Sequence, residues 1–106
     1  MAARKNAKNA ASYKEFDLEG KEFNYSGRIY TDSKRKAGKL TIYPMSLTLN
    51  DLITIKGCSF YMTKNNMWVG GPQFESGDEY KEYLFIDKEL NQDMDALAEA
   101  ISKVIE

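Results

Sequence analysis

The sequence predicts an α+β domain, built as a curved antiparallel sheet of about five strands followed by one C-terminal amphipathic helix. Two observations favour this class. Segments of alternating apolar and polar residues recur between positions 22 and 86, separated by turn-forming residues, as expected of strands. After position 87 the apolar spacing becomes that of a helix. Strands followed by one helix are typical of α+β domains, and 106 residues are enough for a single one.

The N-terminal part is expected to lie outside the folded domain. We interpret residues 1–20 as a flexible basic arm and residues 21–106 as the domain, because the first twelve residues are rich in Ala, Asn and Lys without apolar periodicity. They resemble no signal peptide, and no segment approaches the ~18 apolar residues of a membrane span. We therefore expect a cytoplasmic protein without membrane contact.

Two segments, 22–31 and 40–49, are predicted to pair as a β-hairpin. Arg28 and Tyr30 fall on the face of the first segment that is opposite its apolar residues. The connection between the segments combines turn-forming residues with several cations. The hairpin tip should therefore present positive charge to solvent.

Glycine and proline mark irregular positions in the predicted sheet. Gly27 indicates a bulge or the close approach of another backbone, and Pro44 indicates an edge or a bulge because it cannot donate to a ladder. Residues 52–62 read as a further strand whose apolar alternation changes phase at Gly57.

The remaining extended segments precede the helix. Residues 67–71 are predicted to form a short strand, 73–79 a loop, and 80–86 a final strand that returns antiparallel. Asp87 is a favourable N-cap, and acidic residues in the first turns suit the helix dipole. The apolar stripe that must pack on the sheet is Leu90, Met94, Leu97, Ala98, Ile101, Val104 and Ile105.

Composition argues against an enzyme. The chain has no His and a single cysteine, Cys58, which excludes His-based acid–base chemistry, Cys–His nucleophiles and cysteine-rich zinc sites. No cofactor motif is present, and the acidic residues of 75–82 lack the spacing of a calcium loop. We therefore expect no cofactor and no metal.

Charge is distributed unevenly along the chain. Residues 1–64 contain 12 Lys and Arg against 6 Asp and Glu, net +6, whereas residues 65–106 contain 3 against 10, net −7. Such an asymmetry favours either a polyanionic partner for the basic part or self-complementarity between copies. The sheet face not covered by the helix is available for such a contact.

Cations and aromatic rings near the predicted hairpin suggest a nucleic-acid site, because phosphates need cations and bases need flat faces. The candidate stacking residues are Tyr25, Tyr30, Tyr43, Tyr61 and Trp68. The residues selected for binding are Arg28, Tyr30, Lys34, Arg35, Lys36, Lys39, Tyr43 and Lys64. Trp68 is expected to anchor the core or a dimer. The acidic helix is unsuited to reading a major groove, so single strands on the sheet are favoured.

A pattern of single residues over positions 39–105 adds to this reading. It consists of Ser46, Thr48, Leu49 and Asn50; then Asn65, Trp68, Val69 and Pro72; then Tyr80, Lys81 and Glu82 before the helix. This pattern resembles the SpoVG family of small bacterial and phage nucleic-acid-binding proteins. Where that family has Ser-Arg-Lys after the proline, this chain has Gln-Phe-Glu, and its positive charge lies in the hairpin tip and the arm. The layout is also similar to that of PC4-type single-strand DNA binders, which act as dimers.

Together these features predict a small homodimeric protein that binds single-stranded DNA or RNA with little sequence preference. The alternative from a different class is a small phage-type protein-interaction module that inhibits a host protein, with its acidic half mimicking nucleic acid. Retention of labelled oligonucleotide at low salt favours the first function, and capture of one host protein without DNA binding favours the second.

Overall fold

A computed structural model describes residues 13–84 and 86–106 of the protein. Its elements in chain order are β2 (Lys14–Glu19), β3 (Asn24–Ile29), a 3₁₀ turn (Thr31–Ser33), β4 (Arg35–Ala37), β5 (Leu40–Leu49), β6 (Ile53–Met62), β7 (Met67–Gly70), β8 (Gln73–Ser76), β9 (Glu79–Glu82), a second 3₁₀ turn (Lys88–Leu90) and α2 (Asn91–Ile105).

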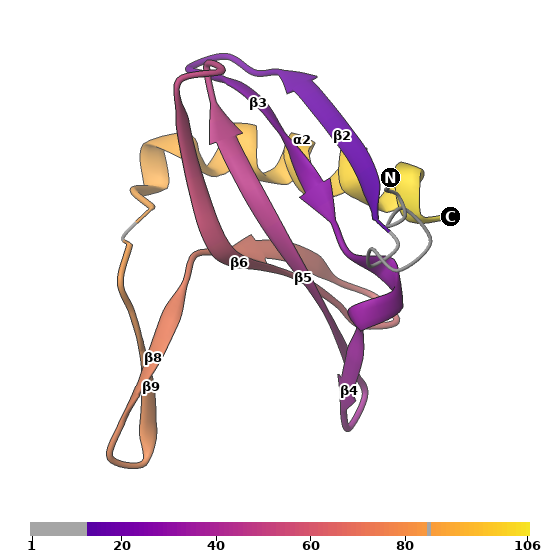
Figure 1. Ribbon diagram of the computed structural model, residues 1–106, viewed down its shortest axis with the longest axis vertical. Helices are drawn as coiled ribbons and strands as arrows, with labels where there is room; N and C mark the ends of the chain where they lie inside the picture. The colour runs from indigo at the N-terminus through magenta and orange to yellow at the C-terminus, as the bar shows by residue number, and fades with distance from the viewer. Residues whose placement is uncertain (1–12, 85) are drawn as a thin grey trace, which may run out of the picture.

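The predicted α+β class is confirmed. The main sheet is antiparallel with the strand order β2-β3-β5-β6-β7, and β4 adds to β5 at one end. The sheet curls like half of a barrel, and α2 lies behind it in Figure 1, in contact with both edge strands, β2 and β7. The helix therefore closes the open side of the half-barrel and fills its concave face. Among the described residues, no helix is long and apolar enough to span a membrane.

The fifth strand differs from the prediction. Segment 80–86 does not return to the main sheet; instead β8 and β9 pair with each other as a separate two-stranded ribbon, and the expected loop at 73–79 supplies its first strand and turn. The missing strand is β2, which pairs along its whole length with β3 and lies inside the segment expected to be an arm. Phe16 of β2 is buried, and this burial explains why the segment is ordered. The rest of the expected arm, residues 1–12, lies outside the described residues.

The predicted hairpin of β3 and β5 is present, with an insertion. Pairing of β3 with β5 runs to Ile29 and Met45, and β4 then continues along β5 from Ile42. Pro44 lies between the part of β5 that pairs with β3 and the part that pairs with β4. The Pro44 carbonyl accepts from the Tyr30 N–H at 2.9 Å, while the Tyr30 carbonyl accepts from the N–H of Ser33 at 3.3 Å. Proline has no N–H to donate to the Tyr30 carbonyl, but this carbonyl is not left unpaired because it accepts from Ser33 in the 3₁₀ turn. Proline is therefore tolerated in a central strand at this position.

Both irregular glycines behave as expected. At Gly27 the β5 backbone approaches so closely that a Cβ would lie 2.1 Å from the Ser46 carbonyl oxygen. In β6, Lys56 and Gly57 together oppose the single residue Ser46, and Gly57 has a φ of +85°, so this is a bulge that needs glycine. The bulge shifts the alternation so that both Ile55 and Cys58 face the core.

The core lies between the concave face of the sheet and α2. Tyr25, Ile29 and Phe60 from the sheet pack with Leu97 and Ile101 of the helix, and all are fully buried. The predicted helix stripe is confirmed from Met94 onward, because Leu97, Ala98 and Ile101 are buried and Met94, Val104 and Ile105 pack against them. Leu90, also expected in the stripe, lies in the 3₁₀ turn before α2 and outside the core cluster. Asp87 is an N-cap as predicted, but of the 3₁₀ turn Lys88–Leu90 that precedes α2, with Oδ1 accepting from the Glu89 N–H at 2.9 Å.

Candidate nucleic-acid interface

The convex face of the main sheet, here called the outer face, is turned away from α2. Because side chains alternate along a strand, residues between the core positions fall on it: Ser26 and Arg28 in β3, Ser46 and Thr48 in β5, and Thr54 in β6. These residues are polar, whereas Tyr25, Ile29, Met45 and Leu47, which alternate with them in β3 and β5, are apolar and buried. The outer face thus combines hydroxyl groups with positive charge near the middle of the sheet.

One row of residues crosses the outer face at the end near β4. Arg35 is paired with Ile42, Ile42 with Tyr61, and Tyr61 with Trp68, so the four residues lie side by side on β4, β5, β6 and β7. Ile42 is buried but does not belong to the main core cluster. A guanidinium, an aliphatic side chain and two rings therefore stand in line on one surface. We call this set the outer row.

The rings of the outer row are stacked. Tyr61 and Trp68 have centroids 5.3 Å apart and planes only 15° from parallel. Gly70 permits this geometry, because a Cβ at that position would lie 2.8 Å from Cε2 of Tyr61. Trp68 is nevertheless 45% exposed. The pair is therefore a preformed aromatic surface that reaches solvent, which is the form of surface on which nucleobases stack.

A second aromatic group lies toward the β2 edge. Tyr13 and Tyr30 contact each other edge to face, with centroids 5.9 Å apart. The guanidinium carbon of Arg28 lies 4.5 Å from the Tyr13 ring centroid, a cation–π geometry. Arg28 is thus held in position while remaining exposed.

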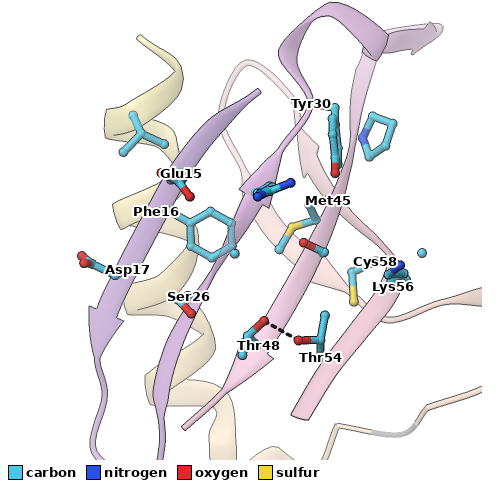
Figure 2. A pocket seen from close by; sticks show the side chains of 16 residues that line it. Glu15, Phe16, Asp17, Ser26, Tyr30, Met45, Thr48, Thr54, Lys56 and Cys58 are labelled. Atoms are coloured by element: carbon cyan, nitrogen blue, oxygen red, sulfur yellow. Dashed lines mark hydrogen bonds between the residues drawn. The ribbon is translucent and has the colours of Figure 1, made fainter. Parts of the chain in front are cut away.

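A shallow groove of about 840 Å³ opens beside this group. Its lining includes Arg28, Tyr30, Lys56 and four hydroxyl-bearing residues, Ser26, Ser46, Thr48 and Thr54. Figure 2 shows Thr48 and Thr54 facing each other across neighbouring strands, with their hydroxyl oxygens 2.8 Å apart. Cations and hydroxyl donors in a groove of this kind suit the phosphate and sugar groups of a nucleic acid.

Two carboxylates limit the extent of any anion site. Glu15 and Asp17 of β2 also line the groove, at the side that Figure 2 shows on the outermost strand. Their charge disfavours phosphate close to them. The surface suited to a polyanion therefore runs from β3 toward β7 and the β4 hairpin rather than across β2.

Most of the selected cations gather at the β4–β5 hairpin. Lys34, Arg35, Lys36 and Lys39 are all exposed, and no ion pair in the described part of the chain engages them. Lys64, also exposed, follows β6 at the same end of the sheet, because Lys36 is paired with Thr41 and Thr41 with Met62. The fold thus brings these cations to the end where the outer row lies.

Three of the aromatic predictions are changed by the structure. Tyr43 is only 7% exposed and packs against Phe60 in the core, so it cannot take a base; Tyr25 is buried likewise. Trp68 is a partly exposed member of the outer row, so its expected role as a core anchor is wrong, whereas its expected role in a dimer stays a prediction. The wrong assignment of Tyr43 follows from the phase of β5, in which Tyr43, Met45 and Leu47 share the concave face. Lys56 and Tyr13 were not selected, although the period of two along each strand places them beside selected residues.

A buried carboxylate not selected from the sequence holds the helix to the sheet. Asp93 is 4% exposed and accepts hydrogen bonds from the backbone N–H groups of Lys21 and Glu22 and from the Tyr25 hydroxyl, at 2.8, 2.9 and 2.9 Å. The Glu22 amide first, with the Lys21 amide and the Tyr25 hydroxyl, lowers the pKa of Asp93, although burial acts in the opposite direction. This is a structural contact between the first turn of α2 and the β2–β3 turn.

The described residues show no arrangement for redox or metal chemistry. Burial raises the pKa of the Cys58 thiol to about 11, so it is protonated at neutral pH and unreactive. No group of His, Cys, Asp and Glu in residues 13–84 and 86–106 is placed to hold a metal ion.

No family model, curated protein or solved structure matches this chain.

Proposed function

We propose that the protein binds single-stranded nucleic acid on its outer face, with little sequence preference. The observation that carries the proposal is the outer row, in which Arg35 of the basic hairpin shares one surface with the Tyr61–Trp68 stack. The bases stack on the Trp68 end, while the hairpin cations neutralise phosphates. Base–aromatic stacking contributes roughly 1–3 kcal/mol per base and accepts any base, because every base has a flat face.

The groove extends this site toward β3. Arg28 and Lys56 supply further phosphate contacts, and the hydroxyls of the groove suit sugar and phosphate oxygens. Strands pack about 4.8 Å apart, so the distance from β7 to β3 is on the order of 14 Å. A segment of a few nucleotides is long enough to cover it. The resemblance of the chain to the SpoVG family supports the same class of ligand.

Trp68 provides the test because it is the only Trp of the chain. Titration with oligo(dT) at low salt should quench its fluorescence, and added salt should restore it as phosphate contacts are lost. Replacing Lys34, Arg35 and Lys36 together by Ala should weaken binding sharply, reduce the slope of log K against log salt by about 2, and leave the melting temperature nearly unchanged.

The matched control replaces Lys21, Lys88 and Lys103, three exposed lysines outside the outer face. This control removes the same charge and should keep most of the affinity. Equal losses in the two triple variants would show that net charge, not the hairpin, determines binding. A panel of single- and double-stranded DNA and RNA completes the test. If none of these ligands changes Trp68 fluorescence or migrates with the protein at low salt, the proposal is wrong, and capture of a host protein would then favour the protein-interaction alternative.

A further inference from the structure

The β8–β9 ribbon projects away from the sheet and helix, at the lower left of Figure 1. Its base is fixed, because the Tyr83 N–H donates to the Pro72 carbonyl at 2.8 Å and so continues the pairing of the two strands. Beyond that base, the strands pair with each other and pack extensively on no other described element. An isolated two-stranded ribbon is only marginally stable in water. This one therefore gains stability from any surface that covers it.

The negative charge of the ribbon indicates that a positively charged surface covers it. Residues 73–83 carry four carboxylates and one Lys, net −3, whereas residues 34–39 of the β4–β5 hairpin carry four cations and no acid, net +4. No ion pair in the described part of the chain neutralises the hairpin cations. Tyr80 on the ribbon is 70% exposed and adds apolar area to the contact.

The two hairpins of one copy cannot supply this contact to each other. Figure 1 shows them extending past the sheet at well-separated places, the ribbon at the left and the β4 hairpin at the right. Two copies related by a two-fold axis can form this contact twice. In such a dimer the ribbon of the first copy meets the hairpin of the second, and the ribbon of the second copy meets the hairpin of the first. The formal net charge of −1 means that long-range repulsion between copies is weak.

We infer that the protein self-associates as a two-fold dimer in which the β8–β9 ribbon of each copy lies against the β4–β5 hairpin of the other. This contact forms without nucleic acid. Because it is built from exposed charges, it should weaken as salt rises.

Sedimentation velocity without nucleic acid tests the inference through complementary charge reversal. One variant carries Asp78→Lys and Glu79→Lys on the ribbon, which changes its net charge from −3 to +1. The other carries Lys34→Glu, Lys36→Glu and Lys39→Glu on the hairpin, which changes its net charge from +4 to −2. Each alone places like charges at both contacts, and its dimerisation should weaken by at least about tenfold. An equal mixture of the two variants again places opposite charges at both contacts, so it should form heterodimers.

A chain carrying all five substitutions should also dimerise, because its positive ribbon meets a negative hairpin. The matched control, Asp95→Lys with Glu106→Lys, makes the same change of charge on exposed positions of α2 and the C-terminus and should dimerise like the unmodified protein. The inference is overturned if the unmodified protein is monomeric at low salt and high concentration, or if mixing the two variants restores nothing. Neither outcome bears on oligonucleotide binding, which Trp68 fluorescence reports separately.

Discussion

The hydroxyl of Tyr25, in the centre of the core, donates a 2.9 Å hydrogen bond to Oδ2 of Asp93 in the first turn of the only described α-helix. The same carboxylate accepts from two backbone amides of the β2–β3 turn. Strand β3, the turn before it and the helix are thus joined at one buried point. Strand β2, which the buried Phe16 holds in the sheet, leads directly into this turn. Order in β2 and docking of α2 are therefore expected to depend on each other.

Removal of the Tyr25 hydroxyl should lower stability without changing the fold. Tyr25→Phe keeps the buried ring and deletes one donor to Asp93, so the free energy of unfolding should fall by about 1–2 kcal/mol. Urea denaturation should show a lower midpoint with an unchanged m-value. Tyr30→Phe, which deletes a hydroxyl outside the core, is the matched control and should leave the midpoint in place. Equal midpoints in the two variants would contradict the role assigned to Asp93.

The contribution of Asp93 should disappear in acid. Its pKa is lower in the folded protein than in the unfolded chain, so ionised Asp93 stabilises the fold above the ordinary carboxyl pKa of about 4. That stability is lost as pH falls through the folded-state pKa, because the carboxylate must then be protonated. Urea unfolding of the protein and of Asp93→Asn at several pH values should give curves that are well separated at neutral pH and converge below about pH 4. A separation independent of pH would show that the charge of Asp93 is not what stabilises the contact.

Gly70 should prove necessary for the aromatic stack. In Gly70→Ala the new methyl group meets the Tyr61 ring, which must move off Trp68 or strain the sheet. We expect altered Trp68 fluorescence and a stability loss of about 1–3 kcal/mol. Ser59→Ala, at the cross-strand partner of Gly70, should change neither. Under the proposed function, Gly70→Ala should also weaken oligo(dT) binding.

Cys58 should be protected from thiol reagents. The side chain is buried, its thiol donates to the Ile55 carbonyl at 3.7 Å, and burial raises its pKa to about 11. Reaction with a disulfide reagent should be slow in the native protein and complete in urea. Fast labelling under native conditions would mean that the bulge at Gly57 opens readily.

Oligonucleotide binding and self-association should compete if both proposals hold, because both use the cations of residues 34–39. Adding oligo(dT) to the dimer should then release protein monomers that carry nucleic acid, and sedimentation velocity at two wavelengths can detect them. If the oligonucleotide binds intact dimers instead, one of the two contacts lies elsewhere.

Local patterns predicted much of the fold. The boundaries of the strand at 40–49 and the phase change at Gly57 followed from the period of two, and the helix stripe followed from its apolar spacing. Strand β2 was missed because only Phe16 and Leu18 interrupt its charged residues, although they alternate as a strand requires. The ribbon was missed because Gly77 and Asp78 were read as part of a long loop rather than as a two-residue hairpin turn.

The site was harder to predict than the fold because exposure depends on packing. Tyr43 and Tyr61 both occur in aromatic strand segments, and only the placement of α2 decides that the first is buried and the second stacks outside. Asp93 lies four residues before Leu97 and eight before Ile101, on the apolar stripe itself. From the sequence it was assigned to the helix dipole with the other acids of the first turns, and only the tertiary structure identifies the Tyr25 hydroxyl and the two turn amides as its partners.

The junction at Pro44 changes the neighbour of β5 on one side only, because β6 pairs with β5 on both sides of this residue. Strand β5 is held by β3 on one side of this residue and by β4 on the other, and no ladder bond links the two partners across it. The turn beyond the pair Ala37–Leu40, where the β4–β5 ladder ends, can therefore lengthen without disturbing the ladder between β5 and β6. Grafting a longer loop between Ala37 and Leu40 should leave the thermal transition of the domain intact, which makes this tip a natural point for adjusting reach and charge.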